Sequence, residues 1–207
     1  AVRAGQVLRI RLSDSVRRSE IVPSPGPLDL LYEDEDLLIL NKAPGIAVHP
    51  GLGHWDDTLG SFLLAYYDRC GIPADFHPVH RLDKGTSGVM AVAKHAHAQD
   101  VLRRALHTDA FRREYLAVCD GALEQAHGVI DLPLAHAGDS VIRHMAAIGC
   151  PLTGDFLYGR ENPALIPRPA LHAHTLSLLH PLTGQRLSFT VPLPRDMAAL
   201  LIPAAAP

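Results

Sequence analysis

Two spacings of apolar residues alternate along the chain. Residues 37–40 form a short, entirely apolar run between an acidic turn and Pro44-Gly45, which predicts a buried strand. Farther on, apolar residues recur at intervals of three and four, the period of one helix face: Leu59, Phe62, Leu63 and Tyr66. Asp57-Thr58 offers an N-cap for this helix, and Gly71 offers its end.

The same two spacings continue through the rest of the chain. A second helix is predicted where five apolar residues share a face: Ala98, Val101, Leu102, Ala105 and Leu106. Strands are predicted at 89–93, 113–118, Val129-Ile130, Val141-Ile142, 171–179 and 187–191, with a short helix at 196–202. Several strands interspersed with few helices predict an α+β domain with a mixed, largely antiparallel central sheet.

The pattern also suggests where domains begin. Residues 7–12 alternate apolar and polar, so residues 1–12 are interpreted as the remnant of a preceding module. Residues 13–29 are polar and proline-rich, which is typical of a linker. The main domain is predicted to cover residues 30–202.

Composition limits the class of protein. Of 207 residues, 47% are hydrophobic and 20% charged, which indicates a folded globular chain. No apolar run is long enough to span a bilayer and no leader pattern is visible, so we expect a soluble, cytoplasmic protein. Three cysteines without a C-x-x-C pair indicate reduced thiols and disfavour a zinc–cysteine site.

Charge gives a weaker signal. The net charge of −3 does not favour a nucleic-acid partner. The arginines are nevertheless paired along the chain, at 9 and 11, 17 and 18, 103 and 104, and 112 and 113. Local basic patches therefore stay open, although clustered arginine on a helix is commonly a solvated face.

The strongest chemical candidate is Asp83, on the glycine-broken stretch from His80 to Gly88. Arg81 and Lys84 flank this carboxylate, and nearby cations lower a carboxyl pKa. Asp83 is therefore expected to be ionised, as a nucleophile or base must be, with Arg81 available to contact nucleic acid. A structural Asp–Arg ion pair in a turn is the alternative.

A metal site is the second candidate chemistry. His172 and His174 are two apart on a predicted strand and therefore share a face, where Asp155 could complete a ligand set. The sequence has no His-Glu-x-x-His helix, and hydrogen-bonded histidines are the simpler interpretation. We therefore predict no metal, and keep a His/Asp metal hydrolase as a lesser alternative. Nucleophile-elbow and phosphate-loop motifs are missing.

One motif carries a resemblance to a known family. His80-Arg81-Leu82-Asp83-x-x-Thr86-Ser87-Gly88 resembles the signature of the RluA-type RNA pseudouridine synthases. Further stretches are similar to the family in the same order: 31–36, Asn41-Lys42-x-Pro44-Gly45, Val48-His49-Pro50, Arg113-x-Tyr115-Leu116-Ala117-Val118, 144–159, Leu171-His172-Ala173, and 180–194. The agreement covers roughly residues 30–201.

The resemblance implies an enzyme that isomerises uridine in RNA to pseudouridine without a cofactor. Asp83 would be the catalytic carboxylate, Tyr115 the tyrosine beneath the uracil, and Arg143 the basic partner of Asp83. Arg81 would fill the gap left by the flipped nucleotide. His80 and Thr86 of the same motif are predicted RNA contacts.

The resemblance also suggests the partner. Residues 1–12 are similar to the tail of an S4-type RNA-binding module, which favours ribosomal RNA over transfer RNA as substrate. We expect a monomer and no membrane partner.

One region departs from the family pattern. Only residues 135–141 stand where the family has several more strands and a Thr-Gly-Arg-x-His-Gln-Ile-Arg motif. Either part of the sheet has been lost, or a stretch is absent from the sequence as given. We favour the second, because lost central strands would expose backbone polar groups and core surface. The departure leaves Arg143 open and motivates one alternative, an RNA-binding homologue without catalysis.

Overall fold

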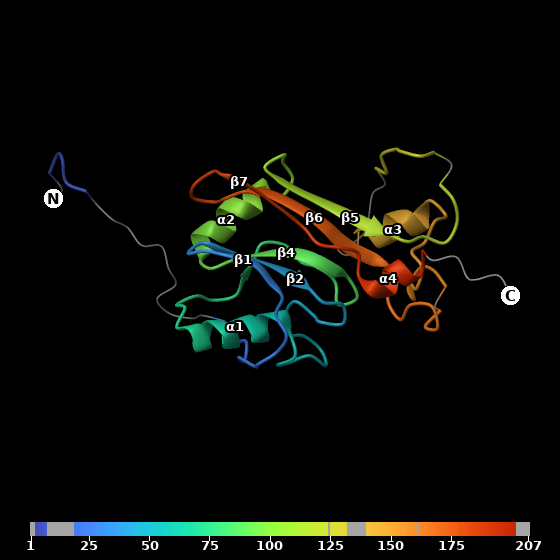
Figure 1. Cartoon of the computed structure of the whole chain (residues 1–207), viewed down its shortest axis with the longest axis horizontal. Helices are drawn as coiled ribbons and strands as arrows, with labels where there is room; N and C mark the ends of the chain where they lie inside the picture. Colours follow the sequence, from blue (N-terminus) through green and yellow to red (C-terminus); the bar gives the residue numbers. More distant parts are fainter. Residues whose placement is uncertain (1–2, 8–18, 124, 132–139, 161, 202–207) are drawn as a thin grey trace.

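The computed structural model describes residues 3–7, 19–123, 125–131, 140–160 and 162–201. Helices and strands follow one another as shown in Figure 1: β1 (Leu30–Glu33), β2 (Leu37–Lys42), α1 (Leu59–Cys70), β3 (His77–Pro78), β4 (Ser87–Ala93), α2 (Ala96–Ala105), β5 (Phe111–Ala117), α3 (Ser140–Ala147), β6 (Leu171–Leu179), β7 (Arg186–Thr190) and α4 (Arg195–Ala199).

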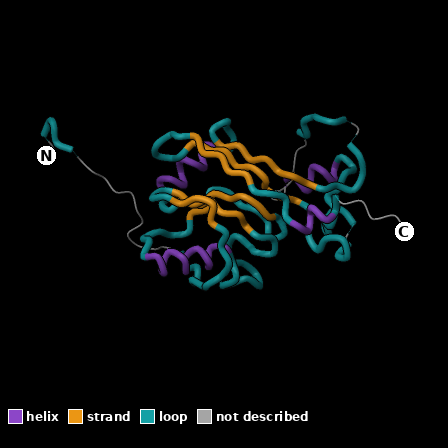
Figure 2. Tube along the Cα trace, viewed as in Figure 1, coloured by secondary structure: helices purple, strands orange, loops and turns teal. Residues whose placement is uncertain are grey.

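A single sheet forms the centre of the described residues (Figure 2). Its strand order is β1-β2-β4-β6-β5, with β3 paired to β4 and β7 paired to β6. Every pairing is antiparallel except that of β4 with β6, which is parallel and joins Ser87 to His172 and Gly88 to Ala173. The predicted α+β class with a mixed, largely antiparallel sheet is confirmed.

The core lies where α1 covers β2 and β4. All seven residues of β4 are buried, and the apolar run of β2 is buried with them. Leu63, Leu64 and Tyr67 bring the apolar side of α1 into the same cluster. Burying each such side chain contributes about 1.5–3 kcal/mol, so this packing fixes the sheet on which the later loops stand.

The ends of α1 follow from its sequence. Thr58 accepts a hydrogen bond from the N–H of Ser61 at 3.2 Å, and Gly71 ends the helix with φ at 65°. Its backbone N–H donates to Asp68 O at 3.3 Å. A left-handed φ is easily reached by glycine, which explains the predicted stop.

Two predicted strands in the later part of the chain are wrong. Val141 and Ile142 lie in helix α3, and Val129-Ile130 forms no strand. In α3, Ile142 is buried against Leu152 and Leu171. Val141, Ile142 and Met145 recur at helical spacing, and a two-residue apolar run cannot by itself distinguish the two structures.

Part of the predicted linker packs on the domain. Ile21 and Leu28 contact the main core, and Ser24 N–H donates to Ser61 O at 3.1 Å. The predicted strand at 7–12 lies almost entirely outside the described residues, as does most of the short middle region at 135–141. In the described part, no helix has both the length and the apolar character required to cross a membrane.

Candidate functional site

The loop from His80 to Thr86 connects β3 to β4 and presents Asp83 beside a cavity. Leu82 is buried and anchors the loop, Asp83 is half-buried, and Arg81 and Lys84 are exposed. Thr86 N–H donates to Asp83 O at 3.1 Å, which closes the turn. The cavity has a volume of about 550 Å³, within the range of small-molecule sites.

Four parts of the chain form the walls of the cavity. They are the Asp83 loop, the Pro44-Gly45 turn, α3 with the segment that follows it, and the segment that leads into β6 together with α4. Its described lining residues are Pro44, Gly45, Asp83, Lys84, Gly85, Thr86, Ile142, Asp155, Phe156, Leu157, Pro167, Arg168, Pro169 and Asp196.

Lys42, at the end of β2, supports the Asp83 turn from below. Its side chain is 1% exposed, and Nζ donates to Ala43 O and Ile46 O at 2.9 Å and to Lys84 O at 3.4 Å. Burial, with a smaller contribution from the charge of Arg168, lowers the pKa of Lys42 to about 7. The hydrogen bonds of this buried amine all go to backbone carbonyls, so Lys42 has a structural role.

Arg168 supports the same turn from the opposite side. Its Nη1 donates to Gly85 O at 3.0 Å and to Leu171 O at 3.2 Å. Nε and Nη2 form a bidentate pair with Asp196 of α4, at 2.7 and 2.9 Å. Burial works against ionisation of Asp196, but the hydrogen bonds and charge of Arg168 hold its pKa below the ordinary value. Arg168 therefore ties α4 and β6 to the Asp83 loop.

Neither supporting cation was predicted from the sequence. Lys42 sits in the Asn41-Lys42-x-Pro44-Gly45 stretch that resembles the family, where a lysine directly after an apolar strand was a usable signal. Arg168 stands between Pro167 and Pro169, and nothing local indicates its distant contacts.

Three carboxylates line the cavity, and their surroundings differ. Asp196 is engaged by Arg168, as described above. Asp155 is fully buried and its Oδ1 accepts from the N–H groups of Leu157 and Tyr158 at 2.9 and 3.2 Å. Asp83 is half-buried and lies on a loop held by two cations through backbone atoms. Asp83 is therefore the cavity carboxylate best placed to meet a ligand.

Thr86 lies at the base of the same loop. Its side chain is 2% exposed, and among the described residues its hydroxyl has no hydrogen-bond partner. A buried hydroxyl without a partner is costly. Thr86, a predicted RNA contact, thus lines the cavity, but its hydroxyl is buried.

His80 points into the core. Its Nε2 accepts from Ala91 N–H at 3.3 Å, and its ring packs edge-on against Phe111 at 5.5 Å between centroids. Burial, assisted by the charge of Arg113, lowers the pKa of His80 to about 3, so the ring is neutral at physiological pH. This placement fits a support for the loop better than the predicted RNA contact.

Tyr115 and Arg143 lie on different elements. Tyr115 is half-buried on β5, just after an irregularity in pairing with β6, and contacts both the main core and the small cluster around Ile142. Burial raises the pKa of Tyr115, against the opposing influence of Arg113. Arg143 is on α3 with its guanidinium over the Tyr158 ring, 5.7 Å from the centroid. Its neighbour Ile142, rather than Arg143, is among the described lining residues.

The alternative metal site is not assembled. His172 Nδ1 lies 2.9 Å from Ser87 Oγ, whereas His174 Nδ1 lies 2.7 Å from Val191 O. Asp155 accepts backbone hydrogen bonds through Oδ1, and the ligand atoms of these three residues do not come together as a possible metal cluster. Within the described ranges, these three residues therefore do not form a ligand set, and the His/Asp hydrolase alternative loses its basis.

A different acidic cluster forms at the β1–β2 turn from Asp34, Asp36 and His180. His180 Nδ1 accepts from the N–H groups of Leu182 and Thr183 at 3.3 and 3.1 Å. Its Nε2 must then carry the hydrogen directed at Asp34 Oδ2, 2.8 Å away. Both ring nitrogens of His180 are thus engaged in hydrogen bonds, so we interpret the cluster as a structural link between the β1–β2 turn and the β6–β7 turn.

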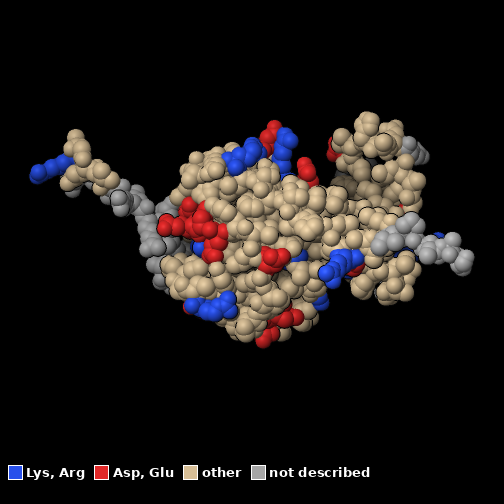
Figure 3. Space-filling view, in the orientation of Figure 1, with Lys and Arg blue, Asp and Glu red and all other residues tan. Residues whose placement is uncertain are grey.

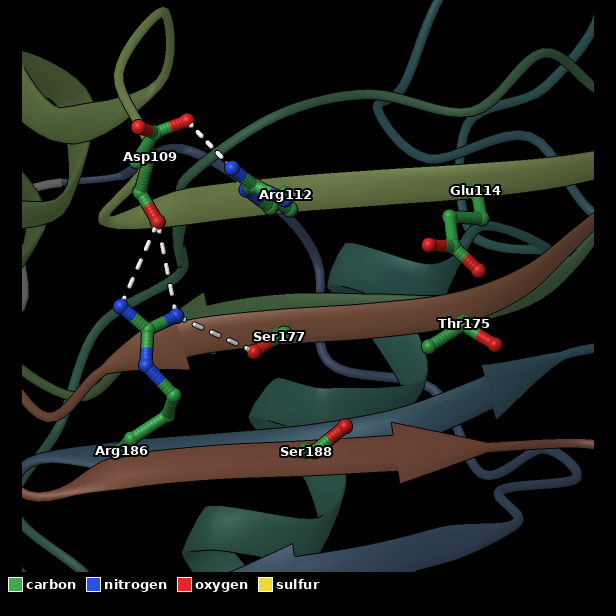
Figure 4. Close-up of a pocket in the computed structure, with 7 residues that line it drawn as sticks. All are labelled: Asp109, Arg112, Glu114, Thr175, Ser177, Arg186 and Ser188. Atoms are coloured by element: carbon green, nitrogen blue, oxygen red, sulfur yellow. Dashed lines mark hydrogen bonds and ion pairs between the residues drawn. The ribbon is translucent and has the colours of Figure 1, made fainter.

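A second depression, of about 340 Å³, lies over β5, β6 and β7 (Figure 4). Its two arginines are engaged locally: Arg112 pairs with the Asp109 carboxylate at 2.7 Å, and Arg186 donates to Asp109 O at 3.4 Å. The remaining labelled side chains are Glu114, Thr175, Ser177 and Ser188. It shares no described residue with the Asp83 cavity, and we call it the control surface because substitutions there should leave that cavity unchanged.

Charge is unevenly spread over the face drawn in Figure 3. Acidic side chains gather at the left, over the turn between β1 and β2, and Lys and Arg form small separate groups. This face carries no continuous basic patch, in keeping with the net charge of −3.

Comparison with known proteins gives a consistent result. Residues 36–157 match the family described as RNA pseudouridylate synthase. The chain is 32% identical over 240 residues to the uncharacterized RNA pseudouridine synthase YjbO of Bacillus subtilis, covering 97% of this chain and 84% of that protein. It is 37% identical over 223 residues to the ribosomal large subunit pseudouridine synthase D of Nitrosomonas europaea, covering 84% and 64%.

Solved structures agree on the fold. Human RNA pseudouridylate synthase domain containing 1 matches with a TM-score of 0.62 at 20% identity, covering 82% of this chain and 86% of that chain. The alignment with the Bacillus subtilis protein runs over 240 positions, more than the 207 residues here. That relative therefore carries residues that have no counterpart in this chain.

Proposed function

The chain belongs to the RNA pseudouridylate synthase family and is an isomerase; from this premise we propose that Asp83 is its catalytic carboxylate. The observation that carries the proposal is the half-buried Asp83 on the wall of a cavity, on a turn fixed by Lys42 and Arg168. A catalytic group held through its backbone keeps its side chain available for the substrate.

The reaction requires no oxidant and no cofactor. The N1–C1′ bond of uridine breaks, the uracil turns, and a C5–C1′ bond forms. The proton on C5 is lost and N1 carries a proton in the product, so atoms and charge balance. An ionised Asp83 fits two roles, nucleophile at the sugar carbon or base at a sugar proton. Both place the carboxylate against the ribose.

The neighbouring residues take roles around this carboxylate. Arg81 is exposed on the same loop, as a residue that fills the gap beside a flipped nucleotide must be. Tyr115 is proposed to lie beneath the uracil. The pairing of Arg143 with Asp83 stays a prediction. We reassign His80 from RNA contact to loop support because its ring is 7% exposed and faces Phe111.

Large-subunit ribosomal RNA is the proposed substrate. The support is the similarity to proteins named ribosomal large subunit pseudouridine synthase D, at 37% identity in Nitrosomonas europaea and 33% in Neisseria meningitidis. Transfer RNA is the alternative. Mapping pseudouridine in total RNA from a strain that lacks the gene decides between them, because one missing modification identifies the target.

The test of Asp83 is tritium release from RNA labelled at C5 of uridine. We expect Asp83→Asn to lower the rate by about 10²-fold or more, because a neutral amide can neither attack nor accept a proton. Asp109→Asn, on the control surface, should keep the wild-type rate. A fully active Asp83→Asn enzyme would end the assignment.

An RNA-binding protein without catalysis is the second candidate. The observation behind it is the shorter chain, since a longer relative aligns over 240 positions. Wild-type protein that binds RNA yet releases no tritium would favour this candidate.

A further inference from the structure

A tight loop lies beside the Asp83 turn. Gly51 and His54 form an isolated antiparallel bridge, with reciprocal backbone hydrogen bonds of 2.8 and 2.9 Å. Gly53 at the tip has φ of 79°, a conformation natural to glycine. The loop therefore has a defined shape that does not depend on burying its own side chains.

One contact brings this loop to Lys84, which follows Asp83, and a second fixes the same histidine, His54, to Asp57. His54 Nε2 lies 2.9 Å from Lys84 Nζ, and His54 Nδ1 lies 2.6 Å from Asp57 Oδ2. Since an ammonium can only donate, His54 accepts from Lys84 and donates to Asp57. Earlier in the chain, His49 lies near Arg81. Burial is the main cause that lowers the pKa of His49, and the charge of Arg81 is the second.

The loop exposes its largest apolar side chains. Trp55 is 72% exposed, and Leu52 is fully exposed. Tryptophan is usually well buried, so an indole held in water on a shaped loop marks a contact surface. The exposed Lys84 contacts His54, the residue before Trp55, and the exposed Arg81 lies close enough to His49 to affect its pKa. An exposed indole beside such cations favours a polyanion with flat bases as the occupant.

We propose that Trp55 stacks on a base of the RNA strand next to the uridine that is flipped toward Asp83. This inference rests on the proposed function and names a further contact for it. Flipping one nucleotide removes a stacking partner from its neighbours, and an indole can replace that partner whatever the base. The hydrogen bonds from Lys84 to His54 and from His54 to Asp57 hold the loop against the Asp83 turn.

The chain offers a clean optical test, because Trp55 is its only tryptophan. The full chain is titrated with a uridine-containing single-stranded RNA of about 12 nucleotides, a length typical of such sites, while indole emission is followed. We expect strong quenching and protection from acrylamide. Inorganic polyphosphate should bind the cations without comparable quenching.

Variants give the second measurement. By anisotropy of labelled RNA, Trp55→Ala should weaken binding about 10-fold, near the low end of a base-stacking contribution, and Trp55→Phe should recover part of it. Leu182→Ala removes another exposed apolar side chain, on the β6–β7 turn, and should bind as wild type. Circular dichroism of each variant checks that the fold is intact.

The outcomes separate this inference from the proposed function. RNA that binds without changing indole emission, or Trp55→Ala that binds as wild type, overturns the stacking and leaves the isomerase proposal untouched. Quenching by RNA in a protein that releases no tritium keeps the stacking and removes the catalysis. Equal quenching by polyphosphate also overturns the inference.

Discussion

Lys42 illustrates how a single residue places the Asp83 turn. Its ammonium is buried and bonded to three backbone carbonyls, including that of Lys84. Taking a charge out of water is costly, and burial accordingly lowers the pKa of Lys42 to about 7. Loss of one proton from Lys42 removes this cost, and the neutral amine still has two N–H donors for the backbone carbonyls.

The stability supplied by Lys42 should therefore depend on pH. The folded pKa is about 7 and the ordinary one 10.5, so between these values the unfolded chain binds one more proton. Stability then rises with pH across this window and is lowest below it. Relative to Lys42→Met, wild type should gain on the order of 1–2 kcal/mol between pH 7 and pH 9.

Urea unfolding at the two pH values measures this difference. Lys84→Met is the matched control, since it removes an exposed lysine from the same turn and should not reproduce the Lys42→Met result. An equal stability difference for Lys42→Met at both pH values would contradict the buried-charge account.

Among the elements, β4 is the strand on which the site depends, and Gly88 is its tightest point. Gly88 has φ of 118°, and a Cβ added there would lie 2.1 Å from Ala173 O. This is the place where β4 meets β6 in parallel. Backbone atoms of Ala173 on β6 occupy the space that any side chain at Gly88 needs.

Gly88→Ala should therefore be severely destabilising, by about 3 kcal/mol or more, because both strain and overlap oppose it. Gly71→Ala is the matched control: its φ is also positive, at 65°, but nothing lies within 4 Å. It should cost only about 1 kcal/mol. Thermal unfolding of both variants measures the contrast, and similar losses would show that close packing at Gly88 is unimportant.

The elements also show what local sequence could predict. Helix α1 was predictable because its period, its Thr58 cap and its Gly71 stop all act within one segment. Helix α3 was misread because a pair of β-branched residues, Val141-Ile142, fits either structure until Leu152 and Leu171 provide a surface to pack on. Tertiary contact decided that case.

The same division holds for the candidate site. Asp83, Arg81 and Thr86 come from one contiguous motif, so their proximity was readable. Arg168 meets Gly85 O across 83 residues, a contact that no local pattern encodes. The core orientation of His80 was likewise invisible, since a histidine beside an exposed arginine gives no sign of its direction.

At the scale of the whole molecule, charge limits how RNA can bind. The net charge is −3, and the exposed cations beside Asp83 are Arg81 and Lys84. We therefore expect few phosphate contacts, about two to four, and a slope of log affinity against log salt of about −1.5 to −3. Anisotropy titrations over a range of salt concentrations measure it. A slope steeper than about −5 would indicate a basic surface beyond these residues.

The parallel seam between β4 and β6 has a consequence for how the protein reaches its native state. It joins Ser87 to His172, 85 residues apart, whereas the β1–β2 and β6–β7 hairpins pair close neighbours in sequence. Closing so long a loop is entropically unfavourable, so we expect the hairpins to form early and this seam late. The nascent enzyme would then gain its working turn only at the last step of folding.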